Sequence, residues 1–302
     1  MSVSRARVAL LGLLVASGWG MAPEAAPITF NTALPVARGE FIFRTQFIVT
    51  GKGDDVGPGQ RDVSVTGAAT VLGYGLSPDL ALFGVLPFLN KEIDLNTAAG
   101  ARIGRHSTGI ADARLFGRYT VFKYNRRGRN FRVAPFFGVE IPTGDDNDGD
   151  KLGRLPATLQ LGSGSWDPFG GLVATYQTLD FQLDGEVSYK RNTRANDFEF
   201  GDEVRLDGSL QYRLWPRQLG GGVPAFAYGV LEANLAHRNR NRTGAVKDDN
   251  SGGTSLMIAP GIQYVSRRWI LEAIVQIPVF QDLNGMALKD DATLRAGFRV
   301  NF

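Results

Sequence analysis

The sequence predicts an all-β protein, a transmembrane antiparallel up-and-down β-barrel of about 12 strands. From residue 40 onward, apolar and polar residues alternate at period two in successive segments. Short and long connections between these segments strictly alternate, and aromatic residues gather at two heights along them. Beyond the N-terminal residues, no apolar run reaches the roughly 18 residues of a membrane-spanning helix.

The alternation is clearest in the last segment, where Ala292, Leu294 and every second residue to Phe302 share one face. Arg295 and Arg299 fall on the other face, as expected for a strand between lipid and a polar interior. The segments that we expect near residues 79, 224 and 254 are the least regular, because both of their faces are partly apolar. We expect strands that begin near residues 40, 62, 79, 109, 130, 165, 180, 202, 224, 254, 268 and 290.

The connections fall into two classes. Short turns are expected at 76–79, 123–129, 178–180, 216–223 and 266–268. Long polar loops are expected at 51–61, 89–108, 142–164, 192–201, 238–253 and 281–289. Because the two classes alternate, all long loops emerge at one end, which is the arrangement of outer-membrane barrels.

Aromatic residues of the apolar face lie at two heights, as the two interfaces of a bilayer require. Near the long-loop end we place Phe88, Trp166 and Tyr189. Near the short-turn end we place Phe41, Tyr119, Phe131, Tyr176, Phe181, Tyr212, Tyr264, Trp269 and Phe302.

Five prolines oppose this assignment, because proline cannot donate to a strand ladder and a closed barrel has no free edge. Pro87, Pro168 and Pro278 fall near the long-loop rim, where a ladder ends or bulges. At Pro135 and Pro260 we expect local bulges or skipped hydrogen bonds.

The N-terminal residues have the pattern of an export signal. Arg5 and Arg7 precede an apolar run from Val8 to Met21, and small residues follow. We therefore expect residues 1–26 to be a signal peptide, cleaved between Gly18 and Ala26, and residues 27–302 to form the barrel domain. A signal anchor is the alternative.

Composition excludes several other classes. The chain has no cysteine, which rules out disulfides and thiol chemistry, and its net charge of +3 gives no argument for nucleic acid. His106 and Ser107 are adjacent on an extended chain and therefore point apart, so we expect no enzyme and no cofactor. The cluster Asp145, Asp146, Asp148 and Asp150 resembles a calcium loop in composition but not in spacing. It is interpreted as a solvated loop, or as a divalent-cation bridge to lipopolysaccharide.

The polar face is unusually rich in charge, and ionised groups cannot face lipid cheaply, so we expect them to line the lumen. Twelve tilted strands give a cylinder roughly 24 Å across, which leaves about 10 Å between opposing side chains. The charges either leave a narrow wet passage or pair across strands and fill the interior. The residues expected in the lumen are Glu40, Arg44, Asp112, Arg114, Arg118, Arg132, Glu140, Asp184, Glu186, Lys190, Arg205, Asp207, Arg213, Glu232, Glu272, Arg295 and Arg299.

Loop length predicts the register of the last hairpin. If 281–289 joins the final two strands, Glu272 lies beside Arg299, and Gln276 beside Arg295. Closure of the barrel would then bring Glu40 near Arg299.

Several motifs resemble the family called putative MetA-pathway of phenol degradation. They are Tyr74-Gly75-Leu76-Ser77-Pro78-Asp79-Leu80, Gly109-Ile110-Ala111-Asp112 leading to Tyr119, Pro142-Thr143-Gly144-Asp145, Leu161-Gly162-Ser163-Gly164-Ser165, and the stretch from Pro260-Gly261-Ile262-Gln263-Tyr264 through Gln276-Ile277-Pro278-Val279 to Leu283-Asn284-Gly285. The resemblance implies an outer-membrane protein that passes small, often aromatic, compounds. It assigns no ligand residues, and the phenol in the family name does not identify the solute.

The sequence therefore predicts a bacterial outer-membrane channel for passive or facilitated passage of small solutes, including aromatic or hydrophobic compounds. The expected partners are membrane lipid, lipopolysaccharide, the solute and the barrel-assembly machinery, for which Phe302 is the terminal signal. A structural barrel with a closed interior is the alternative. An export barrel is a third option, although no passenger domain precedes residue 40.

Overall fold

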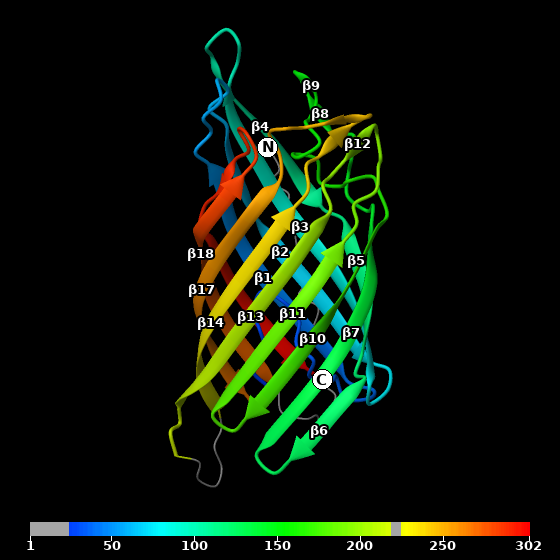
Figure 1. Ribbon diagram of the computed structural model, residues 1–302, viewed down its shortest axis with the longest axis vertical. Helices are drawn as coiled ribbons and strands as arrows, with labels where there is room; N and C mark the ends of the chain where they lie inside the picture. The colour runs from blue at the N-terminus through cyan, green and yellow to red at the C-terminus, as the bar shows by residue number, and fades with distance from the viewer. Residues whose placement is uncertain (1–23, 219–224) are drawn as a thin grey trace, which may run out of the picture.

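The computed structural model describes residues 24–218 and 225–302, which form one closed β-barrel (Figure 1). No helix occurs in these two ranges, and so none there is long and apolar enough to cross a membrane. The strands of the barrel wall are β1 (Phe41–Gly53), β2 (Asp62–Gly75), β3 (Leu80–Asn96), β4 (Arg102–Ile110), β5 (Ala113–Tyr119), β6 (Phe122–Arg126), β7 (Arg129–Ile141), β10 (Asp167–Thr178), β11 (Phe181–Lys190), β13 (Glu203–Trp215), β14 (Ala225–Arg238), β17 (Gly253–Ser266), β18 (Trp269–Leu283) and β20 (Thr293–Asn301). Two-residue ladders in the loops are β8 (Gly149–Asp150), β9 (Gly153–Arg154), β12 (Phe198–Glu199), β15 (Arg242–Thr243), β16 (Val246–Lys247) and β19 (Lys289–Asp290).

The barrel closes by pairing its first strand with its last. β1 runs antiparallel to β20 from Ile42↔Asn301 to Val49↔Leu294. Beyond the ladder, the Phe41 amide donates to the Phe302 carbonyl (2.7 Å) and the Phe302 amide donates back (3.0 Å). β4, β5 and β6 follow one another along a single wall position, so the wall has 12 strands. The predicted fold class, strand number and closure are confirmed.

Two predicted connections are wrong because most of their residues lie in strands of the wall. Residues expected in the loop 89–108 extend β3 to Asn96 and begin β4 at Arg102, and they pair along this whole length. Residues expected in the turn 123–129 form the β6–β7 hairpin, which projects beyond the short-turn end (Figure 1). Both hairpins extend beyond the rest of the wall, where neither face needs to be apolar. The alternation on which the prediction depends is therefore absent.

The prolines interrupt the ladders as expected. Pairing between β17 and β18 skips from Ile258↔Ile277 to Gly261↔Ile274, which leaves out Pro260. A register shift in the same pair lies beside Pro278. The partner of β7 changes from β5 to β6 across Pro135. The N–H that Pro135 lacks therefore falls where this ladder is broken.

The two faces of the wall have opposite polarity. Leu206 and Leu231 point outward and are 57% and 51% exposed, whereas their neighbours Asp207 and Glu232 point inward and are 2% and 1% exposed. An apolar exterior around a polar interior is stable only when lipid covers the outside. Phe41 packs on Tyr74 and Phe302 at the short-turn end, with ring centroids 4.7 and 5.7 Å apart, within the predicted aromatic belt.

The last hairpin has the predicted faces but a register displaced by two residues. Glu272 lies opposite Gly297, and Arg299 lies opposite Ile270. The predicted contact of Gln276 with Arg295 is present, because Arg295 Nε donates to Gln276 Oε1 (2.8 Å). β1 places Arg44 opposite Arg299, and Glu40 precedes β1 at the same end. Within the connection, β19 pairs with β1, and the pairing of β18 with β20 ends at Gln276↔Thr293.

A charge on the lipid face should weaken the fold. We expect Leu206→Arg to lower the free energy of unfolding in bilayers by about 2–4 kcal/mol, because the guanidinium would lie in hydrocarbon. Denaturant unfolding in lipid vesicles measures this change, with Leu206→Met as the volume-matched control. Equal stability of the two variants would contradict a lipid-facing β13.

Candidate functional site

Residues 24–36, called the lumen segment here, lie inside the barrel. The segment begins near the short-turn end, where Arg299 Nη2 donates to the Glu24 carbonyl (2.5 Å). It reaches mid-height at Thr29, beside Glu232 and Asn234 of β14. The chain then returns to the short-turn end, where Gly75 leaves room for the Ala37 carbonyl that a Cβ would strike. The segment is therefore an inward excursion of the chain that precedes β1.

Acidic side chains of the wall accept the amide hydrogens of this segment. Glu232 accepts from the amides of Ile28 (2.6 Å) and Thr29 (3.1 Å), and also from the Thr29 hydroxyl. Glu186 accepts from the Asn31 amide at 3.1 Å. Backbone amides, which sheet pairing would normally satisfy, are here paired with carboxylates.

Basic and amide side chains donate to the carbonyls of the same segment. Arg44 Nη2 donates to the carbonyls of Pro27 (3.3 Å) and Ile28 (2.9 Å), and Gln46 Nε2 donates to Ile28 (2.9 Å). Arg118 Nη2 donates to the Leu34 carbonyl at 2.5 Å. The wall thus recognises mainly the backbone of the lumen segment.

These partners come from two groups of strands. The carboxylates that accept the amides of the segment come from β11 and β14, and the arginines that donate to its carbonyls come from β20, β1 and β5. The peptide lies between them with its amides towards the acids and carbonyls towards the bases. Hydrogen bonds to charged groups contribute about 1.5–3 kcal/mol each, so these bonds hold the segment to both groups of strands.

Small apolar side chains fill the space that remains. Ile28 packs against Val230, Ala259 and Ile274. Ala33 packs in a second cluster with the ring of Phe136. The half of the lumen nearer the short turns is therefore closed by polypeptide.

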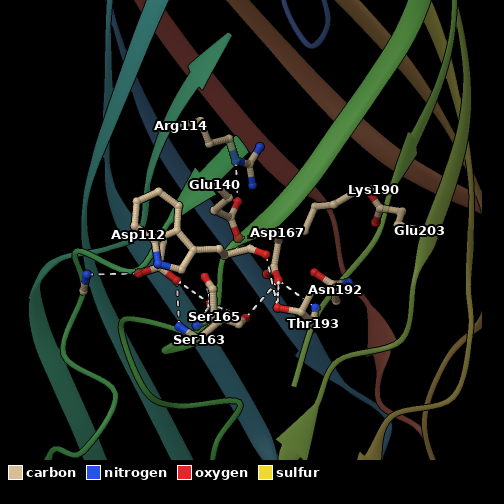
Figure 2. A network of polar contacts seen from close by, with 12 residues as sticks. Asp112, Arg114, Glu140, Ser163, Ser165, Asp167, Lys190, Asn192, Thr193 and Glu203 are labelled. Carbon is tan, nitrogen blue, oxygen red and sulfur yellow. Dashed lines mark hydrogen bonds and ion pairs between the residues drawn. The ribbon is translucent and has the colours of Figure 1, made fainter. Parts of the chain in front are cut away.

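The half nearer the long loops has a different character. Glu140 lies between Arg114 and Lys190, with nitrogen–oxygen distances of 2.5 and 2.6 Å (Figure 2). The Arg114 side chain is 51% exposed although it points inward from β5. Arg238 pairs with Glu203 at 2.6 Å in the same half. These exposed ion pairs indicate that water reaches this part of the lumen from the long-loop end.

Three of the family-like motifs meet at the long-loop rim. Asp112, in the break between β4 and β5, accepts from the Gly144 amide (3.0 Å) and from the Ser163 amide and hydroxyl (2.6 and 2.8 Å) (Figure 2). Thr143 Oγ1 closes the same contact by donating to the Ala111 carbonyl at 3.0 Å. The motifs separated in sequence therefore form one clamp that fixes the loop 142–164 over the lumen.

The other predicted lumen residues follow the register. Glu272 forms an ion pair with Arg44 (2.6 Å), Asp184 accepts from Thr175 (2.5 Å), Arg205 binds Asp207 (3.0 Å) and Arg213 binds Asp180 (2.5 Å). Arg132 lies opposite Thr175 on the inner face of β7, and Glu40 precedes β1 at the short-turn end. The prediction missed the neutral inner residues that also bind the lumen segment, because it considered charges alone. The same alternation marks them: Gln46, Thr175, Asn234 and Gln263.

Weaker sequence signals have ordinary structural roles. Ser107 is buried and donates to Asp148 Oδ2 (3.1 Å). Asp150 pairs with Arg105 at 2.8 Å, and Asp146 accepts from Asn196 at 2.7 Å. In the described residues no group of three or more His, Cys, Asp or Glu side chains is placed to hold a metal ion.

The molecule is thus a transmembrane β-barrel whose lumen is closed at one end by its own N-terminal segment and open to water at the other. The chain belongs to the family described as putative MetA-pathway of phenol degradation, whose model matches residues 45–277. No curated protein sequence matches it.

Solved structures with similar folds are outer-membrane proteins. The COG4313 outer membrane channel from Pseudomonas putida F1 is similar with a TM-score of 0.67 at 13% identity, covering 92% of this chain and 100% of that one. The β domain of the Bordetella autotransporter BrkA has a TM-score of 0.46 at 12% identity, covering 87% of this chain and 100% of that one. At these identities the first likeness concerns the fold alone.

Removing Glu232 should loosen the lumen segment. The natural chain has no cysteine, so Ala33→Cys introduces a unique thiol at a fully buried position. We expect Glu232→Ala to raise the maleimide labelling rate of this thiol at least about tenfold, since the hydrogen bonds from the segment to the Glu232 carboxylate are lost. Glu203→Ala, which removes a carboxylate that binds Arg238, is the control. Equal rates in both variants would show that Glu232 does not hold the segment.

Proposed function

We propose that this chain is a channel of the bacterial outer membrane for small hydrophobic solutes, including aromatic compounds. Membership of the family and the fold of an outer-membrane channel support this function. The observation on which it depends most is the nature of the closure. A peptide held mainly through its backbone closes the lumen, and its departure would leave the strand pairing of the wall intact, because it belongs to none of the wall ladders.

In this mechanism the solute enters from the long-loop end. The ion pairs of Glu140 and Glu203 keep that half of the lumen wet. Further passage requires displacement of the lumen segment, which exposes the carboxylates and arginines that bind it. Near-equal numbers of the two signs give no net field, so weak selectivity between cations and anions is expected.

A structural barrel without transport is the second candidate. The bonds from Glu232, Glu186, Arg44 and Arg118 to the lumen segment favour it, because a permanently closed interior needs such bonds. The two candidates differ in whether closure is reversible.

Three further partners belong to this proposal. Membrane lipid covers the apolar wall, and lipopolysaccharide contacts the long loops around Asp145 and Asp148. Phe302, whose exposed ring ends the last strand, is read by the barrel-assembly machinery.

Deleting residues 27–36 should open the lumen. In planar bilayers we expect the intact protein to conduct weakly, and the deletion variant to conduct at least several-fold more, with a reversal potential near zero in a salt gradient. A variant with these residues replaced by a Gly/Ser stretch of equal length should lie between, because it keeps the backbone but loses the packing of Ile28. A deletion variant that stays electrically silent would favour the structural barrel.

Export should remove the signal peptide before the lumen segment. Residues 1–23 lie outside the described residues, whereas Glu24, Ala25 and Ala26 already contact the inner wall. We therefore expect cleavage between Gly18 and Pro23, which N-terminal sequencing of the purified protein measures. A mature chain that begins at Pro27 would contradict this and would lack the Arg299 contact.

A further inference from the structure

The connections at the short-turn end carry an excess of positive charge. Their described residues include eight arginines or lysines, all exposed, against three acids, which are Glu40, Asp79 and Asp180. These connections are 37–40, 76–79, 120–130, 178–180, 216–218 and 266–268. The six long loops predicted at the other end carry basic and acidic residues in equal number. The positive surface is therefore confined to the periplasmic end of the barrel.

Half of these basic residues lie in the β6–β7 hairpin, which projects beyond the short-turn end (Figure 1). Every residue of β6 is exposed, and Gly128, with a φ of +77°, closes the two-residue turn to β7. Lys123 forms an ion pair with Asp79 of the neighbouring turn. The other three bases pair with no carboxylate among the described residues, and they are Arg126, Arg127 and Arg129. Three guanidinium groups of one hairpin are therefore available to bind an anion.

The hairpin directs two of these arginines towards lipid. Arg126 follows Tyr124 by two residues in β6, so their side chains share a face, and the guanidinium lies 5.3 Å from the centre of the exposed Tyr124 ring. Their partners in β7 are Arg129 and Phe131, which lie on the same face. This face is the outer one, because Phe131 alternates with the lumen residue Arg132. The two arginines thus lie at the lower edge of the aromatic belt, where the headgroups of a bilayer begin.

Two other turns repeat this arrangement. The Arg217 guanidinium lies 5.9 Å from the centre of the Tyr212 ring, which is 44% exposed on the outer face of β13. In the turn between β17 and β18, two exposed arginines stand between Tyr264 and Trp269, whose ring centroids are 5.3 Å apart. A cation beside a ring that faces hydrocarbon lies in the membrane interface rather than in periplasmic water. This position favours a lipid headgroup over a soluble acidic protein as the bound anion.

We propose that six arginines of these turns, called the basic collar here, bind the phosphate groups of anionic phospholipids in the periplasmic leaflet. The basic collar consists of Arg126, Arg127, Arg129, Arg217, Arg267 and Arg268. A guanidinium binds phosphate bidentately, and an excess of basic groups favours a headgroup with net negative charge over a zwitterionic one. The apolar wall accepts any acyl chain, whereas the basic collar selects the headgroup. The inference does not depend on whether the lumen opens.

Native mass spectrometry of the exported protein tests the inference, with phosphatidylglycerol and phosphatidylcholine of identical acyl chains as probes at equal concentration. We expect the intact protein to retain phosphatidylglycerol at least about fivefold more than phosphatidylcholine. A hairpin variant that combines Arg126→Gln, Arg127→Gln and Arg129→Gln should lower this ratio at least about threefold, because half of the collar charge is lost. Arg→Lys at the same three positions keeps the charge and should keep most of the preference. A turn variant with Arg267→Gln and Arg268→Gln tests the collar independently of the hairpin and should also lower the ratio.

A control variant removes the same amount of charge from the other end of the barrel. It combines Arg240→Gln, Arg242→Gln and Lys247→Gln, all at exposed positions of a long loop, and should leave the ratio unchanged. Migration of each variant as a heat-modifiable barrel on gels shows that it has folded.

Three results would overturn the inference. They are equal retention of the two lipids by the intact protein, an unchanged ratio in the hairpin and turn variants, and an equal fall in the hairpin and control variants. Binding of a soluble polyglutamate peptide by an intact protein that has no lipid preference would also overturn it, in favour of an acidic periplasmic protein.

Discussion

The structure depends on compensating ionised side chains inside a narrow space that holds little water. Glu232 is 1% exposed and Glu272 is 6% exposed, and an unpaired carboxylate at such a position would cost several kcal/mol. The fold compensates these two carboxylates in different ways. Arg44 neutralises Glu272 directly, whereas Glu232 receives peptide amides from the lumen segment. The segment therefore completes the electrostatics of the wall as well as filling the lumen.

The wall of the barrel could be predicted from the sequence because one physical rule applies at every strand. Lipid outside and polar groups inside force alternation at period two, so strand number, closure and the faces of Leu206 and Asp207 all follow from it. The rule fails where lipid ends. The hairpin formed by β3 and β4 therefore resembles a loop in sequence although its backbone is fully paired.

The lumen segment could not be predicted from the sequence. Residues such as Ile28 and Ala33 have no alternation of their own, and the wall binds them through backbone groups that every residue possesses. Near-equal charge predicts direct pairing across strands, and the structure has such pairs, as between Arg44 and Glu272. Glu232 and Glu186 bind backbone amides of the segment instead, and composition does not record which carboxylates do so. The register of the last hairpin differs from the prediction by two residues, because loop length alone does not fix it.

The connection between the lumen segment and β1 limits where the segment can go. β1 is locked to β20 by the closing ladder, so the chain remains fixed at Phe41 even when every bond to residues 24–36 is broken. The first residue of the lumen segment, Glu24, also lies on the short-turn side, beside Arg299. In a chain cleaved before Glu24, a released segment would withdraw to that side, where an extended chain of this length reaches roughly 45 Å from the barrel. The open and closed barrels would then differ on the periplasmic side, since the open barrel has a free peptide tail there and the closed barrel holds the same residues inside its lumen.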